Sequence, residues 1–84
     1  MVKIYTTNWC PSCVAAKRFF HEHGINYKEI NIETKNLSRE DLQKICGNYT
    51  VPQIIINNHC VGGYSNLLQL YQSKKLEKLL NEKS

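Results

Sequence analysis

The sequence predicts an α/β fold in which helices flank a mixed sheet of four strands. A strand, a helix and a second strand follow one another in residues 2–32, and a helical connection makes two such strands parallel. Residues 54–61 instead predict a hairpin, whose strands are antiparallel. Because 84 residues suffice for one small core, we expect a single domain, residues 1–84.

Charge and hydropathy argue against several classes of protein. The formal net charge is +4, but the lysines of residues 74–83 are interleaved with glutamates, which is typical of a solvated helix face rather than of a nucleic-acid site. No apolar run approaches the roughly 20 residues that a membrane helix needs. Four cysteines without an apolar leader indicate a reducing compartment. We expect a cytoplasmic monomer that binds neither nucleic acid nor membranes.

The first strand leads directly into a Cys-x-x-Cys motif. Residues 2–6 are mostly β-branched or aromatic and predict a strand. Pro11 suits the first position of a helix, where a missing N–H costs nothing, and good helix formers follow Cys13. Cys10 is therefore expected at the N-cap of a helix that begins inside the motif.

A cysteine at a helix N-cap is suited to redox chemistry. Unpaired N–H groups and the positive end of the helix dipole stabilise a thiolate there, and thiols in such settings have pKa values of roughly 3.5–7.5 instead of about 8.5. Cys13 lies one helical turn after Cys10, within reach for a disulfide. We predict that Cys10 is the nucleophile and Cys13 the resolving thiol.

Half of a structural zinc site is the alternative that a Cys-x-x-Cys pair raises. The second half is missing, because the remaining cysteines, Cys46 and Cys60, form no second pair of this spacing. The three histidines do not stand at zinc-finger spacing either. The pattern favours a dithiol redox site, and we expect no metal.

The chain after the motif completes a parallel strand pair. The first helix is predicted to continue to about His23, and Gly24 is well placed to end it. Residues 25–32 predict a second strand, marked by Tyr27, Ile30 and Ile32.

A second helix is predicted between Ser38, as its cap, and Gly47 at its end. Leu42 and Ile45 are expected to face the core. We interpret Cys46, beside the glycine, as a small buried side chain rather than a reactive thiol.

The hairpin follows a proline. Pro52 is expected at the strand entrance, since proline cannot donate to a strand ladder, and a cis bond before it stays open on the residues alone. Asn57 and Asn58 tolerate positive φ and predict the turn within residues 54–61. Cys60 is interpreted as a packed strand residue.

Two helices are predicted in the rest of the chain. After Gly62 and Gly63, a helix should run from about Ser65 to Ser73, with Ser65 or a neighbour as its cap. Free N–H groups at its start suit an anion. Residues 74–81 predict a short last helix that covers the core with leucines.

With its elements in this order, the chain resembles a glutaredoxin of the compact bacterial dithiol type. Three motifs agree with that family over almost the whole length: Cys10-Pro11-Ser12-Cys13, Thr50-Val51-Pro52 and Gly62-Gly63-Tyr64-Ser65-Asn66. The resemblance implies a thioredoxin-like fold, with a four-stranded mixed sheet flanked by helices. It also implies a cis bond between Val51 and Pro52.

The resemblance further implies a glutathione site. Backbone groups of Val51, next to Pro52, would pair with the cysteinyl part of glutathione, and the γ-glutamyl end would lie just after the Gly-Gly pair. The residues at that second position are Tyr64, Ser65 and Asn66. Residues expected to support the site are Tyr5, Pro11 and Gly63.

The implied activity is that of a glutathione-dependent thiol–disulfide oxidoreductase. Such an enzyme reduces protein disulfides and glutathione mixed disulfides through the Cys10 and Cys13 thiols. Glutathione is then the co-substrate, and the partners are disulfide-containing or glutathionylated proteins.

Two departures from the family pattern keep other functions open. Ser12 stands where the family usually has tyrosine, and Thr7 where it commonly has a lysine that meets the glycine carboxylate of glutathione. A redoxin of the same shape that is reduced by thioredoxin reductase is the nearest alternative. Another is a module that uses Cys10 to bind a metal or an iron–sulfur cluster, and Pro11 argues against a cluster.

Overall fold

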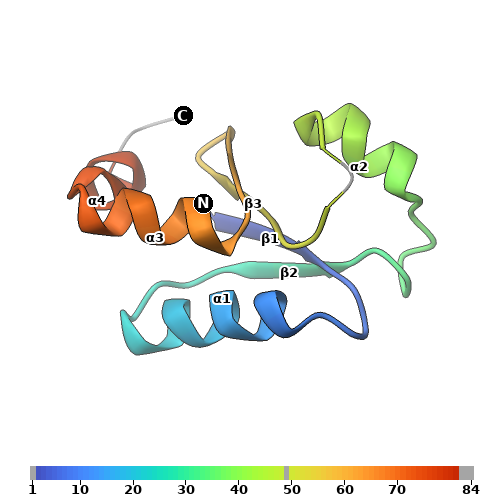
Figure 1. Cartoon of the computed structure of the whole chain (residues 1–84), viewed down its shortest axis with the longest axis horizontal. Helices are drawn as coiled ribbons and strands as arrows, with labels where there is room; N and C mark the ends of the chain where they lie inside the picture. Colours follow the sequence, from blue (N-terminus) through green and yellow to red (C-terminus); the bar gives the residue numbers. More distant parts are fainter. Residues whose placement is uncertain (1, 49, 82–84) are drawn as a thin grey trace.

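The structure, a computed structural model, describes residues 2–48 and 50–81 (Figure 1). Its four strands form one sheet in the order β2-β1-β3-β4. The strands are β1 (Val2–Thr6), β2 (Lys28–Asn31), β3 (Gln53–Ile56) and β4 (His59–Gly62). β1 is parallel to β2, whereas β3 is antiparallel to both of its neighbours. The mixed four-stranded sheet predicted from the sequence is confirmed.

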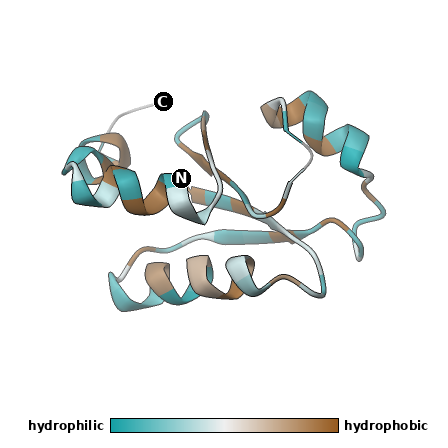
Figure 2. Cartoon of the chain, in the orientation of Figure 1, coloured by the Kyte–Doolittle hydropathy of each residue, from teal (hydrophilic) through white to brown (hydrophobic). Residues whose placement is uncertain are grey.

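Helices cover both faces of this sheet. They are α1 (Pro11–Glu22), α2 (Arg39–Cys46), α3 (Tyr64–Gln72) and α4 (Lys75–Leu80). Figure 1 shows α1 and α3 running alongside one another, with α2 apart from them, and α1 and α3 are in contact. Along α1 and α3, hydrophobic residues recur among hydrophilic ones, as in helices with one buried side (Figure 2).

The protein has two cores, one on each face of the sheet. Ile4 belongs to the larger core and Tyr5 to the smaller, because successive residues of a strand point to opposite faces. The larger core is built from the sheet, α1, α3 and α4, through Val2, Ile4, Ala16, Phe19, Phe20, Ile54, Ile56, Leu67 and Leu76. The smaller core, beneath α2, contains Tyr5, Ile32 and Leu42.

Helix α2 begins and ends as predicted. The Ser38 hydroxyl accepts from the Asp41 N–H at 3.1 Å, and the Asp41 carboxylate accepts from the Ser38 N–H at 2.9 Å. This reciprocal capping box satisfies two N–H groups at the helix start. A hydrogen bond from the Ser38 backbone N–H lowers the pKa of Asp41 most, and a hydrogen bond from the Ser38 hydroxyl lowers it further. At the other end Gly47 adopts the left-handed conformation, with φ 79°.

The predicted turns are also confirmed. Gly24 has φ 64° after α1. Asn57 and Asn58, with φ 48° and 72°, form the turn between β3 and β4. Asparagine reaches this region at low cost, which explains its use at both turn positions.

Two predicted boundaries are wrong. The second strand occupies only Lys28–Asn31, not most of residues 25–32, because its pairing with β1 begins at Lys28. Helix α3 begins at Tyr64, with Gly63 as its N-cap, so neither Ser65 nor another side chain caps it.

Three predicted burials are wrong as well. Ile45 is 43% exposed, because the smaller core extends beneath only part of α2. Cys46, the last residue of α2, is partly exposed. Cys60 is exposed, since β4 is an edge strand and the larger core takes the other face of the hairpin.

Candidate active site

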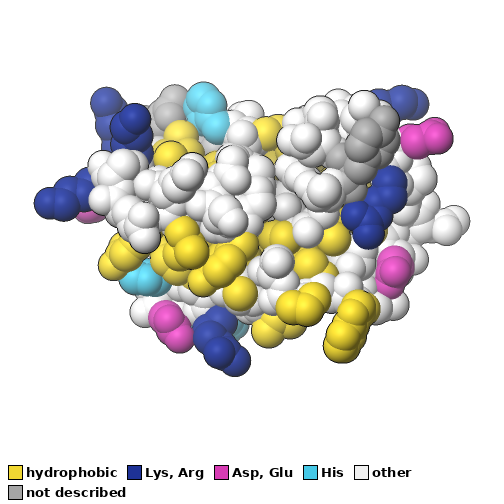
Figure 3. Space-filling model, in the orientation of Figure 1, with side chains coloured by type: hydrophobic (Ala, Val, Ile, Leu, Met, Phe, Trp, Pro, Cys, Tyr) yellow, Lys and Arg dark blue, Asp and Glu magenta, His cyan; other side chains and the backbone are white. Residues whose placement is uncertain are grey.

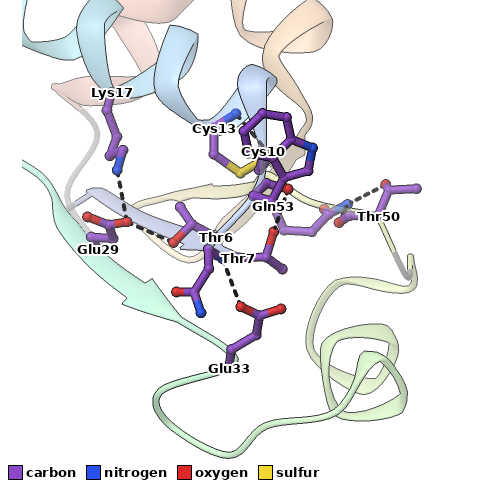
Figure 4. The surroundings of a disulfide bond; sticks show 11 residues. Thr6, Thr7, Cys10, Cys13, Lys17, Glu29, Glu33, Thr50 and Gln53 are labelled. Atoms are coloured by element: carbon purple, nitrogen blue, oxygen red, sulfur yellow. Dashed lines mark hydrogen bonds and ion pairs between the residues drawn. A yellow bond between two sulfur atoms is a disulfide. The ribbon is translucent and has the colours of Figure 1, made fainter.

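Cys10 and Cys13 form a disulfide at the start of α1 (Figure 4). Their Cα atoms are 5.2 Å apart. Cys10 is the N-cap of the helix, with the extended φ of −154° and ψ of 95°, and it is partly exposed. Cys13 is only 2% exposed. The structure thus confirms an accessible sulfur at the helix cap and a second sulfur behind it.

Backbone N–H groups at the helix start face the Cys10 sulfur. The Cys13 N–H donates to Cys10 Sγ at 3.1 Å, and the Val14 N–H donates to the Cys10 carbonyl at 3.1 Å. The first turn of α1 contains no acidic side chain. When the disulfide is reduced, a negative charge on Cys10 would meet an N–H donor and the positive end of the helix dipole. This environment suits Cys10 as the attacking thiolate.

Polar contacts across two strand ends brace the loop before Cys10. The Asn8 N–H donates to the Glu33 carboxylate at 3.0 Å, and the Asn31 amide donates to Asn8 Oδ1 at 2.8 Å. Within the loop, the Thr7 hydroxyl donates to the Trp9 carbonyl at 3.3 Å. Sequence reasoning missed the roles of Asn8, Asn31 and Glu33. The available signal was the parallel pairing of β1 and β2, which brings their carboxyl ends together.

An ion pair lies to one side of the disulfide (Figure 4). Lys17 Nζ is 3.0 Å from the Glu29 carboxylate, which also accepts from the Thr6 hydroxyl at 2.8 Å. Burial raises the pKa of Glu29, but hydrogen bonds from Thr6 and Lys17 and the charge of Lys17 outweigh burial and lower it. These contacts tie α1 to β1 and β2 next to the active-site loop.

The loop before β3 lies beside the disulfide. The bond between Val51 and Pro52 is cis, as the resemblance implies. The Gln53 amide donates to the Thr50 carbonyl at 2.8 Å and to its hydroxyl at 3.1 Å, which holds the loop in place (Figure 4). Tyr5 is the strand partner of Gln53 but points into the smaller core, so any support that it gives to the site passes through the strand.

The glycine turn before α3 adjoins this loop. Gly62 has φ 110°, a conformation that side-chain-bearing residues rarely adopt, and a Cβ there would also lie 2.9 Å from the Asn66 amide nitrogen. A Cβ on Gly63 would lie 3.8 Å from the Pro52 carbonyl oxygen, which places the turn next to the proline. Since no side chain caps α3, its first N–H groups are available to a ligand.

Exposed apolar side chains flank the two cysteines in the sequence. Trp9 is 86% exposed and Val14 53% exposed, on either side of the disulfide in sequence. Pro11 and Ser12, between the two cysteines, are exposed too. Figure 3 shows hydrophobic side chains gathered at this end of α1 and between α1 and α3. The surface around Cys10 is suited to contact with another protein.

The described residues contain neither a metal-binding cluster nor a membrane-spanning helix. No group of three or more His, Cys, Asp or Glu side chains in residues 2–48 and 50–81 could hold a metal ion. Over the same ranges, no helix is both long enough and apolar enough to cross a membrane.

Comparison with known proteins identifies the family. The model of the Glutaredoxin family matches residues 2–61, most of the chain. The chain belongs to the glutaredoxin family. It is 41% identical to a glutaredoxin of Pseudomonas aeruginosa over 80 residues, which cover 95% of both chains.

Solved glutaredoxins share the fold. The solution structure of a Brucella melitensis glutaredoxin is 38% identical, with a TM-score of 0.79 over 94% of this chain and 86% of that one. The crystal structure of a buckwheat glutaredoxin–glutathione complex gives a TM-score of 0.85 at 22% identity, over 94% of this chain and 74% of that one. The predicted thioredoxin-like fold is therefore confirmed.

Family and geometry together give the general activity. Glutaredoxins are thiol–disulfide oxidoreductases, and this member has its Cys10 and Cys13 sulfurs in a disulfide. The roles predicted for Val51, Pro52, Tyr64, Ser65 and Asn66 remain predictions, although the structure brings the proline loop and the start of α3 together.

Proposed function

We propose that this glutaredoxin reduces protein disulfides and glutathione mixed disulfides, with glutathione as its co-substrate. The observation that best supports the proposal is the hydrogen bond from the Cys13 N–H to the sulfur of Cys10, a partly exposed residue at the start of a helix. We also place the protein in the cytoplasm, where glutathione would keep this dithiol largely reduced.

Removal of glutathione from a protein needs only one of the two thiols. The Cys10 thiolate attacks the glutathionyl sulfur of the mixed disulfide, and the bond to the protein sulfur breaks. The protein leaves as a thiolate and takes up a proton. A second glutathione thiolate then attacks the sulfur of the bound glutathione, which releases glutathione disulfide and restores Cys10.

Reduction of a disulfide within a protein uses both thiols. The Cys10 thiolate forms a mixed disulfide with one substrate sulfur, and Cys13 then attacks Cys10 Sγ and expels the reduced protein. The product is the Cys10–Cys13 disulfide that the structure contains. Two glutathione molecules restore both thiols and leave as glutathione disulfide, so two electrons pass from glutathione to the substrate.

Glutathione would lie between the proline loop and the start of α3. Backbone groups of Val51, beside Pro52, would pair with its cysteinyl part, and the first N–H groups of α3 would hold the γ-glutamyl carboxylate. Three facts support this placement: α3 has no side-chain cap, Gly63 adjoins Pro52, and the buckwheat protein of the same fold was solved with glutathione. The helix residues concerned are Tyr64, Ser65 and Asn66.

A specific observation favours a second electron donor, thioredoxin reductase. Thr7 stands where a lysine would meet the glycine carboxylate of glutathione. Its hydroxyl already donates a hydrogen bond to the Trp9 carbonyl. This position therefore offers glutathione no cation. The exposed Trp9 and Val14 would suit contact with a reductase protein.

Coupled assays with the two donor systems distinguish these functions. One contains glutathione, glutathione reductase and NADPH, and the other contains thioredoxin reductase and NADPH, both with a glutathionylated protein as substrate. We expect protein-dependent NADPH oxidation with glutathione and none with thioredoxin reductase alone. The reverse result would overturn the proposed co-substrate and support the second donor. A reaction without the protein sets the background in each case.

A further inference from the structure

A second pair of thiols lies on the other side of the sheet from α1. Cys46 is the last residue of α2, and Cys60 is on the edge strand β4. Cys60 pairs with Ile55, which packs against the smaller core beneath α2. The Cys60 thiol donates to the Ile45 carbonyl at 3.6 Å, which brings β4 against the end of the helix at the residue before Cys46.

Cys60 Sγ is 3.6 Å from the carbonyl oxygen of Ile45, the residue before Cys46, so the two thiols are close enough to influence each other. A hydrogen bond from the Cys46 thiol to the Cys60 sulfur favours the protonated form of Cys46. Burial, this hydrogen bond and the charge of an ionised Cys60 together raise the pKa of Cys46 to about 12. Tyr5 lies beside both: burial first, and then the charges of Cys46 and Cys60, raise its pKa. Three groups that become anionic on ionisation are thus gathered in one place.

We propose that Cys46 and Cys60 are a second redox-active dithiol, which a small-molecule disulfide such as glutathione disulfide oxidises to a disulfide between the end of α2 and β4. The proposal does not depend on the proposed function, because glutathione disulfide acts here as an oxidant and the Cys10–Cys13 pair takes no part. Neither cysteine belongs to a motif, and only the packing of α2 against the sheet brings them together.

Exposure determines the order of the two steps. Cys60 is the more exposed thiol, so its thiolate attacks one sulfur of glutathione disulfide and expels one glutathione thiolate, which takes up the proton that Cys60 lost. The Cys46 thiolate then attacks Cys60 Sγ and expels the second glutathione. Two cysteines lose two electrons, and one glutathione disulfide becomes two glutathione molecules.

The first step prepares the second. Once Cys60 is in a mixed disulfide, it can no longer become a thiolate, so it neither accepts a strong hydrogen bond from the Cys46 thiol nor repels a charge on Cys46. Two of the three causes that raise the pKa of Cys46 then disappear, and only burial remains. Cys46 therefore ionises more readily at the moment when a partner sulfur is available beside it.

The new bond would enclose the proline loop before β3 in a covalent ring. The chain from Cys46 to Cys60 contains Gly47, the Val51–Pro52 bond and the turn between β3 and β4. This ring joins the end of α2 to the edge strand of the sheet, which the bond from the Cys60 thiol to the Ile45 carbonyl already brings together.

The test uses the full chain with Cys10→Ser and Cys13→Ser, so that Cys46 and Cys60 are the remaining thiols. The protein is equilibrated in mixtures of glutathione and glutathione disulfide, quenched in acid, alkylated, and analysed by mass spectrometry without reduction. As the share of glutathione disulfide rises, we expect both alkylation sites to be lost together, without a glutathione adduct. Peptide mapping should find Cys46 linked to Cys60.

Two further variants, each with Cys46→Ser or Cys60→Ser added, are the matched controls. Neither should give the doubly protected product, and the one that keeps Cys60 should accumulate a glutathione adduct. Disulfide mapping of the unsubstituted chain in the same buffers repeats the measurement on a protein that carries none of the serine substitutions. The proposal is overturned if both thiols are alkylated at every ratio, or if Cys60 stops at the glutathione adduct while Cys46 is alkylated.

Discussion

Each cysteine pair of this protein has one member at a helix end, and the two ends are opposite in polarity. Cys10 is at the N-cap of α1, where an N–H group points at its sulfur. Cys46 is the last residue of α2, where carbonyl groups are exposed, and its neighbour Cys60 donates to one of them. The positive helix end favours a thiolate, whereas the negative end favours a protonated thiol. Helix position favours different protonation states for Cys10 and Cys46, and burial and the neighbouring Cys60 raise the pKa of Cys46 further.

The comparison also shows that two cysteine pairs can both be close in space and yet differ in how readily their thiols ionise. Both pairs bring two sulfurs together, one through a helical turn and the other through packing of distant elements. In the first pair the helix start activates Cys10 before any substrate arrives. In the second, Cys46 is held protonated until its partner has been oxidised. The first pair is suited to turnover and the second to a slower response to oxidising conditions.

The strongest test of this contrast is to remove one exposed thiol from each pair. We expect Cys10→Ser to lower the rate of deglutathionylation by more than about 10³-fold, because the covalent nucleophile is lost. Cys60→Ser, the matched control, should keep a rate close to that of the unsubstituted chain. The assay couples glutathione reductase to NADPH oxidation. Substantial activity of Cys10→Ser would show that another thiol is the nucleophile.

A second test compares the two helix ends by alkylation. A thiol with a pKa of about 12 is ionised in only about one molecule in 10⁵ at pH 7, and its higher nucleophilicity recovers roughly half of that deficit on a logarithmic scale. We expect iodoacetamide to label Cys10 at least about 10²-fold faster than Cys46 in the reduced protein at pH 7. The difference should shrink as the pH rises, because the Cys46 thiolate fraction grows while that of Cys10 reaches its limit.

Peptide-resolved mass spectrometry of quenched samples gives both rates in one experiment. Equal labelling of Cys10 and Cys46 at neutral pH would mean that the helix ends do not control the two thiols. Labelling of Cys46 in the Cys60→Ser variant sharpens the result. It should be faster than in the unsubstituted chain, since a serine hydroxyl does not ionise and so places no negative charge beside Cys46.

The first pair was predictable from the sequence and the second was not. The strand before Cys10, Pro11 at the helix start and the spacing to Cys13 are all local, so the N-cap and the disulfide follow from neighbouring residues. The contact between Cys46 and Cys60 depends on where α2 lies on the sheet. That position is set by the burial of Leu42 in the smaller core, which no local pattern specifies.

The same division holds for the rest of the fold. The asparagine turn and Gly47 were predicted because they depend on backbone conformation. The brace between Asn8 and Glu33 was missed, since it joins segments that only the sheet brings together. The exposure of Ile45 was missed for a similar reason, because the spacing from Leu42 places both on one side of α2 without showing how far the core extends.

The smallest expected effect concerns the starts of the two helices. The Ser38 hydroxyl accepts from an N–H three residues on at 3.1 Å, as the Cys10 sulfur does, but Ser38 has no partner with which to react. We expect Ser38→Ala to lower the free energy of unfolding by about 1 kcal/mol, or the melting temperature by about 4–8 °C, and to leave deglutathionylation unchanged. Ser65→Ala is the control for stability, because Ser65 lies within α3 and does not cap it. Thermal unfolding followed by circular dichroism measures both. Equal losses in the two variants would mean that the Ser38 hydroxyl does not act as a cap, and the parallel between Ser38 and Cys10 would then fail.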